Sequence, residues 1–191
     1  MLCGFGVEEI LVISGPTTNA TITVSGNIKM IKSDKSIHNI CIASIKRSTM
    51  NPYDFKWTKF YDSNLDFNST YPELLIEFAE NELIISSTVI DMNNYSILTT
   101  NRLFTIENGI LNSGDLINAI DKFYGEFKGI DNSLFTFGLV QLESGHNLKY
   151  FIETGKASMV MIHGVRTVIR SQQMTKIQVE KVTKIWNDKS E

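Results

Sequence analysis

Apolar and polar residues alternate in short runs over most of this chain. Residues 20–25 and 38–45 alternate with a period of two, and the residues from Glu73 onward form short apolar runs. Segments of turn residues separate the later runs: Glu80-Asn81, Met92-Asn93-Asn94 and Glu107-Asn108-Gly109. Because side chains of a strand point alternately to its two faces, this spacing predicts a predominantly antiparallel β domain.

Two turns carry more specific signals. Asn108-Gly109 suits a backbone with positive φ, which asparagine and glycine adopt at the least cost. The segment Glu143–Asn147 lies between two apolar runs and contains Gly145, so it predicts a hairpin turn.

Residues 113–128 fit two different structures. Helical spacing is present at Leu116, Ile117, Ile120, Phe123 and Tyr124. Ser113 or Asp115 could cap such a helix. Looser alternation through Leu116, Asn118, Ile120 and Lys122 indicates a strand instead. Both structures remain open from the sequence.

After Gly155 the period changes to that of an amphipathic helix. The apolar stripe consists of Ala157, Val160, Met161, Gly164, Val165, Val168 and Ile169. Thr154 is the expected N-cap oxygen. Gly164 costs about 1 kcal/mol relative to alanine inside a helix, so we expect close packing against a sheet there. A second periodic stretch, from Gln172 to Trp186, either continues this helix or follows a break near Ser171.

These elements suggest three parts of the chain. We predict an N-terminal β-rich extension or small β unit over residues 1–71, a main domain over 72–170, and a C-terminal helical extension over 171–191. The boundary best fits residues 62–72. Whether residues 1–71 join the main sheet stays open.

Composition and charge narrow the class of protein. The 191 residues are 42% hydrophobic, which suffices for a real core, and no run of about 18 apolar residues predicts a membrane span. Net charge is −3, with a basic region over 29–60 and an acidic one over 61–148. The N-terminus lacks the pattern of a signal peptide, so we expect a cytoplasmic protein with reduced Cys3 and Cys41.

No residue pattern predicts catalysis. Gly155-Lys156 lacks the upstream glycine and the following Ser or Thr of a phosphate-binding loop. His38, His146 and His163 are scattered without metal-ligand spacing, and His163 is expected at the boundary of the helical apolar stripe. We therefore predict no cofactor, no metal and no enzymatic activity.

Residues 73–170 resemble a pleckstrin-homology (PH-like) domain of the GRAM or bacterial PH kind. Thr99, Arg102 and Leu103 match one phrase of that family, and Leu142, Ser144 and Gly145 match its hairpin. The resemblance implies a bent antiparallel β-sandwich or partly open barrel, capped by a C-terminal amphipathic helix. It also implies a binding scaffold. The first two strands of the matched region contain no lysine or arginine, so the family's usual phosphoinositide pocket is not expected.

The first hypothesis for function is a protein-binding or adaptor module. The candidate interaction surface comprises Lys46, Arg47, Tyr53, Phe55, Lys56, Trp57 and Lys59, together with Ile177 and Trp186 of the C-terminal stretch. That last stretch could mediate assembly into a homo-oligomer. Ordinary core packing is the competing interpretation of the aromatic residues.

Two alternatives belong to other classes. One is a small-ligand protein or enzyme with a diffuse site inside a β-cavity. The other is contact with nucleic acid or an anionic membrane through the basic, aromatic residues 29–61. A pI near 5.7 argues against a nucleic-acid partner, so none is expected.

Overall fold

The computed structural model describes residues 12–15, 18–21, 29–30, 32–74 and 76–173. Contacts divide the chain into two compact units. One comprises residues 1–33 and 174–191, and the other comprises residues 34–173.

The described part of the first unit is a three-stranded antiparallel sheet. Its strands are β1 (Val12–Gly15), β2 (Thr18–Thr21) and β3 (Lys29–Met30), in the order β1-β2-β3. Val12 pairs with Thr21, and Ala20 pairs with Met30. The alternation predicted over residues 20–25 begins in β2, and residues 22–28 lie outside the described part of the chain.

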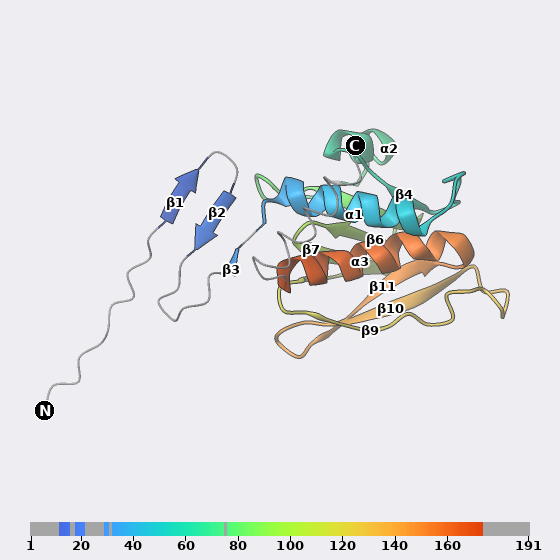
Figure 1. The fold of residues 1–191 in the computed structure, drawn as a ribbon. Coiled ribbons are helices and arrows are strands. Elements are labelled where there is room, and N and C mark those ends of the chain that lie inside the picture. The colour runs from blue at the N-terminus through green and yellow to red at the C-terminus, as the bar shows by residue number, and fades with distance from the viewer. Residues whose placement is uncertain (1–11, 16–17, 22–28, 31, 75, 174–191) are drawn as a thin grey trace, which may run out of the picture. The chain divides into compact units, whose positions relative to one another are not determined.

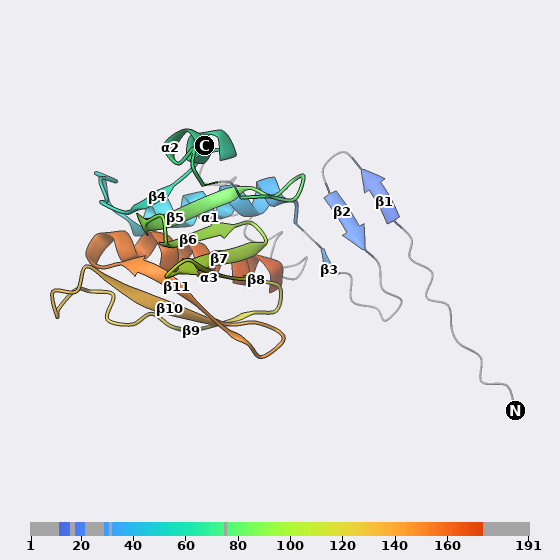
Figure 2. The same ribbon diagram turned by 180° about the vertical axis from the view of Figure 1, so that it is seen from behind.

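The second unit contains two antiparallel sheets (Figures 1 and 2). The five-stranded sheet, in the order β4-β5-β6-β7-β8, consists of β4 (Thr58–Phe60), β5 (Ile84–Asp91), β6 (Asn94–Thr99), β7 (Arg102–Glu107) and β8 (Ile110–Asp115). The three-stranded sheet consists of β9 (Ile120–Phe123), β10 (Phe135–Gln141) and β11 (Asn147–Glu153). The two sheets do not close into a barrel, so the predicted mainly β, α+β fold class is confirmed in its open form.

Two helices pack against each other over the core. They are α1 (Asp34–Ser48) and α3 (Ser158–Gln173), and the Ser44 and Thr167 hydroxyls form a hydrogen bond of 3.1 Å between them. Figure 1 looks onto both helices and Figure 2 looks from the opposite side onto the five-stranded sheet, so both helices cover one face of that sheet. The main core lies beneath them.

Successive side chains of the central strands point to opposite faces of the sheet and so belong to two separate cores. Ile85 and Leu98 belong to the main core under α1 and α3. Their neighbours Ile84 and Ile97 belong to a second core on the opposite face of the sheet, which contains Phe67. Phe67 comes from α2 (Asn64–Thr70), whose first turn is closed by a capping box between Ser63 and Asp66. The central strands of the five-stranded sheet are therefore covered on both faces.

The alternation over residues 38–45 does not form a strand. These residues lie inside α1, and its buried positions are Ile37, His38, Cys41, Ile42 and Ile45. That spacing of i, i+1, i+4, i+5 and i+8 is helical. The prediction was wrong because residues 40–43 are all apolar, which makes the periods of strand and helix hard to separate in so short a run.

The contacts also divide the chain differently from the predicted boundary at residues 62–72. The compact unit starts at Asp34, and residues 34–71 belong to it together with the two sheets. β4 joins the same sheet as β5, with Lys59 opposite Ser87. The aromatic segment around β4 thus extends the main sheet by one short strand.

Residues 113–128 take up the strand alternative rather than the helical one. They contain the end of β8, a turn, and β9. Leu116 and Ala119 in the turn are fully buried, and the Ala119 N–H donates to the Leu116 carbonyl oxygen at 3.2 Å. The apolar residues at helical spacing are therefore divided between a buried turn and an exposed strand.

The remaining local predictions have mixed outcomes. The hairpin around Gly145 is confirmed, since Gln141 pairs with Asn147. Asn108 and Gly109 have φ of 52° and 78°, as their turn requires. The expected N-cap is wrong: a short 3₁₀ turn, Gly155–Ala157, precedes α3, and the Thr154 hydroxyl donates to the Ser133 carbonyl oxygen instead.

Close packing at Gly164 is confirmed. A Cβ atom at this position would lie 2.7 Å from Leu98 Cδ2 and 3.4 Å from Ser86 Oγ. The continuation of the helix past Gln173 lies outside the described residues. Within the described ranges, no helix has the length and apolar character needed to cross a bilayer.

Candidate functional site

The predicted aromatic surface is tied to the end of β11. The carboxylate of Glu153 accepts hydrogen bonds from the backbone N–H groups of Lys56, Trp57 and Thr58, at 3.0, 3.0 and 2.8 Å. Three donors on one carboxylate fix the path of the chain into β4. This segment therefore has a structural role in joining the two sheets.

The aromatic side chains of this segment make internal contacts. Phe55 is partly buried and packs against the main core. Tyr53 stacks edge-to-face on Phe60 with ring centroids 5.1 Å apart, and Lys56 Nζ lies 4.3 Å from the ring centroid of the half-buried Trp57. Core packing accounts for Phe55, whereas Trp57 keeps part of its ring at the surface.

The basic residues of the predicted surface differ in their surroundings. Lys46 Nζ lies 3.4 Å from Asp62 Oδ1, and Lys59 Nζ lies 5.7 Å from the centroid of the Tyr71 ring. Arg47 is exposed in the last turn of α1. Ile177 and Trp186, and with them the predicted self-association stretch, lie outside the described residues.

Two residues of the family phrase bind a carboxylate that the sequence analysis did not single out. Glu82 is 2% exposed, and its oxygens accept from the Thr99 hydroxyl at 2.5 Å and from Arg102 Nη2 at 2.5 Å. Burial would raise the pKa of Glu82, but the hydrogen bonds from Arg102 and Thr99 outweigh it and the pKa lies below its usual value. Thr99 and Arg102 therefore stabilise the fold.

The exposed large apolar side chains concentrate in one part of the sequence. Of eleven such side chains among the described residues, eight lie between residues 110 and 135. We call this set the apolar edge: Ile110, Leu111, Ile117, Ile120, Phe123, Ile130, Leu134 and Phe135. Exposed apolar residues scattered singly are ordinary, whereas contiguous exposed apolar patches mark interaction sites.

Four residues of the apolar edge lie on strands that end a sheet: Ile110 and Leu111 on β8, and Ile120 and Phe123 on β9. β8 is the last strand of the five-stranded sheet and β9 is the last strand of the three-stranded sheet. Only residues 116–119 connect them. In the described part of the chain, each pairs with one neighbour only. One side of each strand therefore offers backbone N–H and C=O groups to a further strand.

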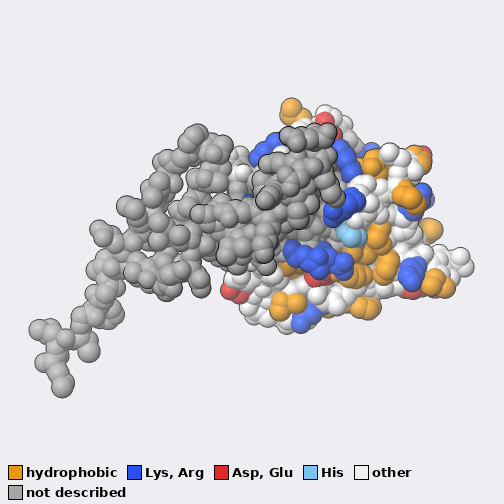
Figure 3. All heavy atoms as spheres, viewed as in Figure 1, with side chains coloured by type: hydrophobic (Ala, Val, Ile, Leu, Met, Phe, Trp, Pro, Cys, Tyr) orange, Lys and Arg blue, Asp and Glu red, His pale blue; other side chains and the backbone are white. Residues whose placement is uncertain are grey.

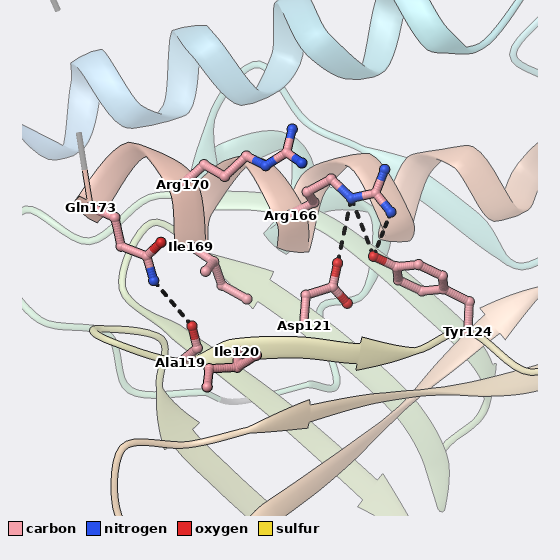
Figure 4. Close-up of a pocket in the computed structure, with 8 residues that line it drawn as sticks. All are labelled: Ala119, Ile120, Asp121, Tyr124, Arg166, Ile169, Arg170 and Gln173. Carbon is pink, nitrogen blue, oxygen red and sulfur yellow. Dashed lines mark hydrogen bonds and ion pairs between the residues drawn. The ribbon is translucent and has the colours of Figure 1, made fainter. Parts of the chain in front are cut away.

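A pocket lies where β9 faces the C-terminal half of α3 (Figure 4). Its volume is about 540 Å³, and it is lined by Ala119, Ile120, Asp121, Tyr124, Arg166, Ile169, Arg170 and Gln173. Arg166 Nη2 donates to the Tyr124 hydroxyl at 2.7 Å, and Arg166 Nε lies 3.4 Å from Asp121 Oδ2. Gln173 Nε2 donates to the Ala119 carbonyl oxygen at 3.3 Å.

Buried polar atoms lie close to this pocket. Asp121 Oδ1 and the Tyr150 hydroxyl are buried, and neither has a hydrogen-bond partner in the described part of the protein. Burial raises the pKa of Asp121, and the hydrogen bond and charge of Arg166 offset this rise in part. Burial also raises the pKa of Tyr150 well above its usual value, and the charge of Asp121 adds to the rise.

Among the described residues, no group of three or more His, Cys, Asp or Glu side chains is placed to hold a metal ion. His38 is buried in α1, with Nε2 3.0 Å from the Tyr61 carbonyl oxygen, and His146 is exposed in the β10–β11 turn. Comparison of the chain with family models, with curated proteins and with solved structures gives no match in any of the three.

Proposed function

We propose that this chain is a protein-binding module that holds an extended segment of a partner protein along the apolar edge. The observation that carries the proposal is the exposure of apolar side chains on two strands that each end a sheet. Folded proteins usually protect such edges with charge, bulges or covering loops. An added strand would satisfy the edge backbone groups and bury the apolar side chains together.

The scaffold we propose for this module is PH-like. Four consecutive strands, β5–β8, form one antiparallel array, and β9–β11 form a second, followed by α3. This order agrees with the order that the family resemblance implies. In this scheme α1 and β4 are additions, with α1 sharing the main core and β4 extending the first array at β5.

The charge around the apolar edge favours a basic partner over a second copy of the chain. Residues 107–131 contain five acidic residues and two lysines, and two of the acids are paired with residues outside this range, Glu107 with Lys149 and Asp121 with Arg166. A small negative excess remains, from Asp115, Glu126 and Asp131 against Lys122 and Lys128. A second copy would bring the same negative excess to the interface, and like charges oppose association. We therefore propose a partner segment with apolar residues at alternate positions and Lys or Arg at its flanks.

The test uses the full chain and a displayed library of extended peptides with alternating apolar positions. We expect selected peptides to carry basic flanks and to bind the wild-type protein. Phe123→Asp, which places a charge on the edge, should weaken their binding at least tenfold, or about 1.4 kcal/mol. The matched control is Leu65→Ser, which removes an apolar residue that is 74% exposed on α2.

Two results would overturn the proposal. One is a library that yields no binder to the correctly folded protein. The other is a set of binders whose affinity is insensitive to Phe123→Asp, or falls equally in Leu65→Ser. Light scattering on the wild-type chain gives an independent check, because self-association that Phe123→Asp abolishes would assign the edge to a second copy.

A further inference from the structure

Positive charge from two helices gathers beside the pocket of Figure 4. Arg166 and Arg170 line the pocket from α3. His163 lies one turn earlier on the same helix, and Arg47 comes from the last turn of α1. Burial is the largest cause that lowers the pKa of His163, and the charges of Arg166, Arg47 and Arg170 lower it further. All three guanidinium groups thus act on one half-buried imidazole.

Little negative charge compensates this cluster. Asp121 is the acidic residue that lines the pocket, and its carboxylate pairs with Arg166. Arg170 makes no hydrogen bond or ion pair with any described residue, and in Figure 4 its guanidinium lies on the same side of α3 as that of Arg166. On the face drawn in Figure 3, Lys and Arg side chains lie above and below a histidine. Among the described residues, these three guanidinium groups against the one carboxylate that lines the pocket leave an excess of about two positive charges.

We propose that this pocket binds a phosphate-bearing ligand, with Arg170 and Arg166 donating to the phosphate oxygens. A guanidinium group presents paired N–H donors that match the oxygens of a phosphate. A phosphate monoester carries about 1.5 to 2 negative charges at pH 7, which matches the local excess better than a single carboxylate does. Arg47 adds to the attraction without needing direct contact.

The remaining lining fits the organic part of such a ligand. Ile120 and Ile169 contribute apolar surface, and the volume of about 540 Å³ is within the range of small-molecule sites. The phosphate could belong to a soluble ester or to a lipid headgroup, since both present the same oxygens. The site is separate from the strand-binding role proposed for the apolar edge, although Ile120 borders both.

The experiment titrates the full chain with inorganic pyrophosphate and, in a second arm, with phosphatidylcholine vesicles with and without phosphatidic acid. The variant is Arg170→Gln, because this side chain is exposed and makes no hydrogen bond or ion pair with the described residues. We expect it to weaken binding about tenfold, the loss of one charge-assisted hydrogen bond. The matched control, Lys59→Gln, removes an exposed positive charge on β4 and should leave affinity unchanged.

The pKa of the His163 imidazole, measured by NMR, gives a second test of phosphate binding. In the free protein its pKa lies below the usual value, and a bound phosphate would raise it by cancelling the neighbouring positive charges. Pyrophosphate binding that weakens in Arg170→Gln and raises the pKa of His163 supports a soluble ligand. Binding only to vesicles that contain phosphatidic acid, with the same dependence on Arg170, supports a lipid headgroup. Failure of both probes, equal losses in the two variants, or an unmoved His163 pKa would overturn the proposal.

Discussion

Arg102 donates to the carboxylate of Glu82 at 2.5 Å, and this contact neutralises an acid that the fold buries almost completely. Arg102 begins β7 and Glu82 lies just before β5, so the pair spans the strand between them. Thr99, at the end of β6, donates to the other carboxylate oxygen. Three segments of the five-stranded sheet are therefore joined at one buried charge.

Removing Arg102 should destabilise the protein through Glu82. We expect Arg102→Met to cost about 3 kcal/mol in the free energy of unfolding at pH 7, because it leaves a buried carboxylate without its ion-pair partner. Urea denaturation at pH 7 measures this loss. The double variant Arg102→Met with Glu82→Gln should recover part of it, and an equal loss in the single and double variants would contradict the assignment.

The pH dependence of the same pair has a defined sign. In the wild type the folded-state pKa of Glu82 is lowered, so its contribution is present above the unfolded-state pKa and is lost as pH falls through the folded-state pKa. In Arg102→Met, burial acts without the arginine and should raise that pKa. The loss of stability relative to wild type should then grow as pH rises from about 4 to 6. A loss independent of pH would indicate packing rather than charge.

Glu153 should hold the segment before β4 in place. Glu153→Ala removes the acceptor of three backbone N–H groups, and we expect a loss of about 1 to 2 kcal/mol in stability, since the site is only half-buried. Hydrogen exchange should accelerate at the amides of Lys56, Trp57 and Thr58. The control Glu80→Ala removes an exposed carboxylate and should change neither quantity. Unchanged exchange at all three amides would contradict this role.

The sequence predicted elements well where their period was unambiguous. The stripe from Ala157 to Ile169 contains polar residues at regular intervals, so it identified α3. Residues 40–43 are all apolar, so the period of residues 38–45 was ambiguous, and the helix α1 was missed for that reason. Pairing of Glu82 with Arg102 could not be predicted, because it depends on which strands become neighbours.

The candidate sites were harder to predict than the fold. Alternation indicates that a segment is a strand, but it does not reveal whether that strand ends a sheet. Ile110 and Phe123 were therefore indistinguishable from core residues in the sequence. The pocket beside Arg166 and Arg170 was missed because its Asp121 comes from a strand more than forty positions away along the chain. Only the folded chain brings these groups together.

Gly164 should be hard to replace despite its place in a helix. Alanine has the higher helix propensity by about 1 kcal/mol, which alone would stabilise α3. Its Cβ would lie 2.7 Å from Leu98 Cδ2, and Leu98 is fully buried. We expect overpacking to dominate, so that Gly164→Ala loses about 1 to 2 kcal/mol by thermal or urea unfolding. Leu98→Val in the same chain should recover part of the loss, and a stabilised single variant would show that Leu98 moves aside.

Tyr150 carries a hydroxyl group that should contribute little to stability. The side chain is fully buried and its ring packs over Gly138, where a Cβ would lie 2.1 Å from Tyr150 Cζ. Its hydroxyl has no hydrogen-bond partner among the described residues. An unsatisfied buried hydroxyl is costly, so Tyr150→Phe should leave the free energy of unfolding unchanged or raise it by about 1 kcal/mol. Gly138→Ala, by contrast, should destabilise the protein strongly, because the added methyl group would overlap the Tyr150 ring. A loss above about 1 kcal/mol in Tyr150→Phe would instead indicate a bound water that links this hydroxyl to Asp121 Oδ1.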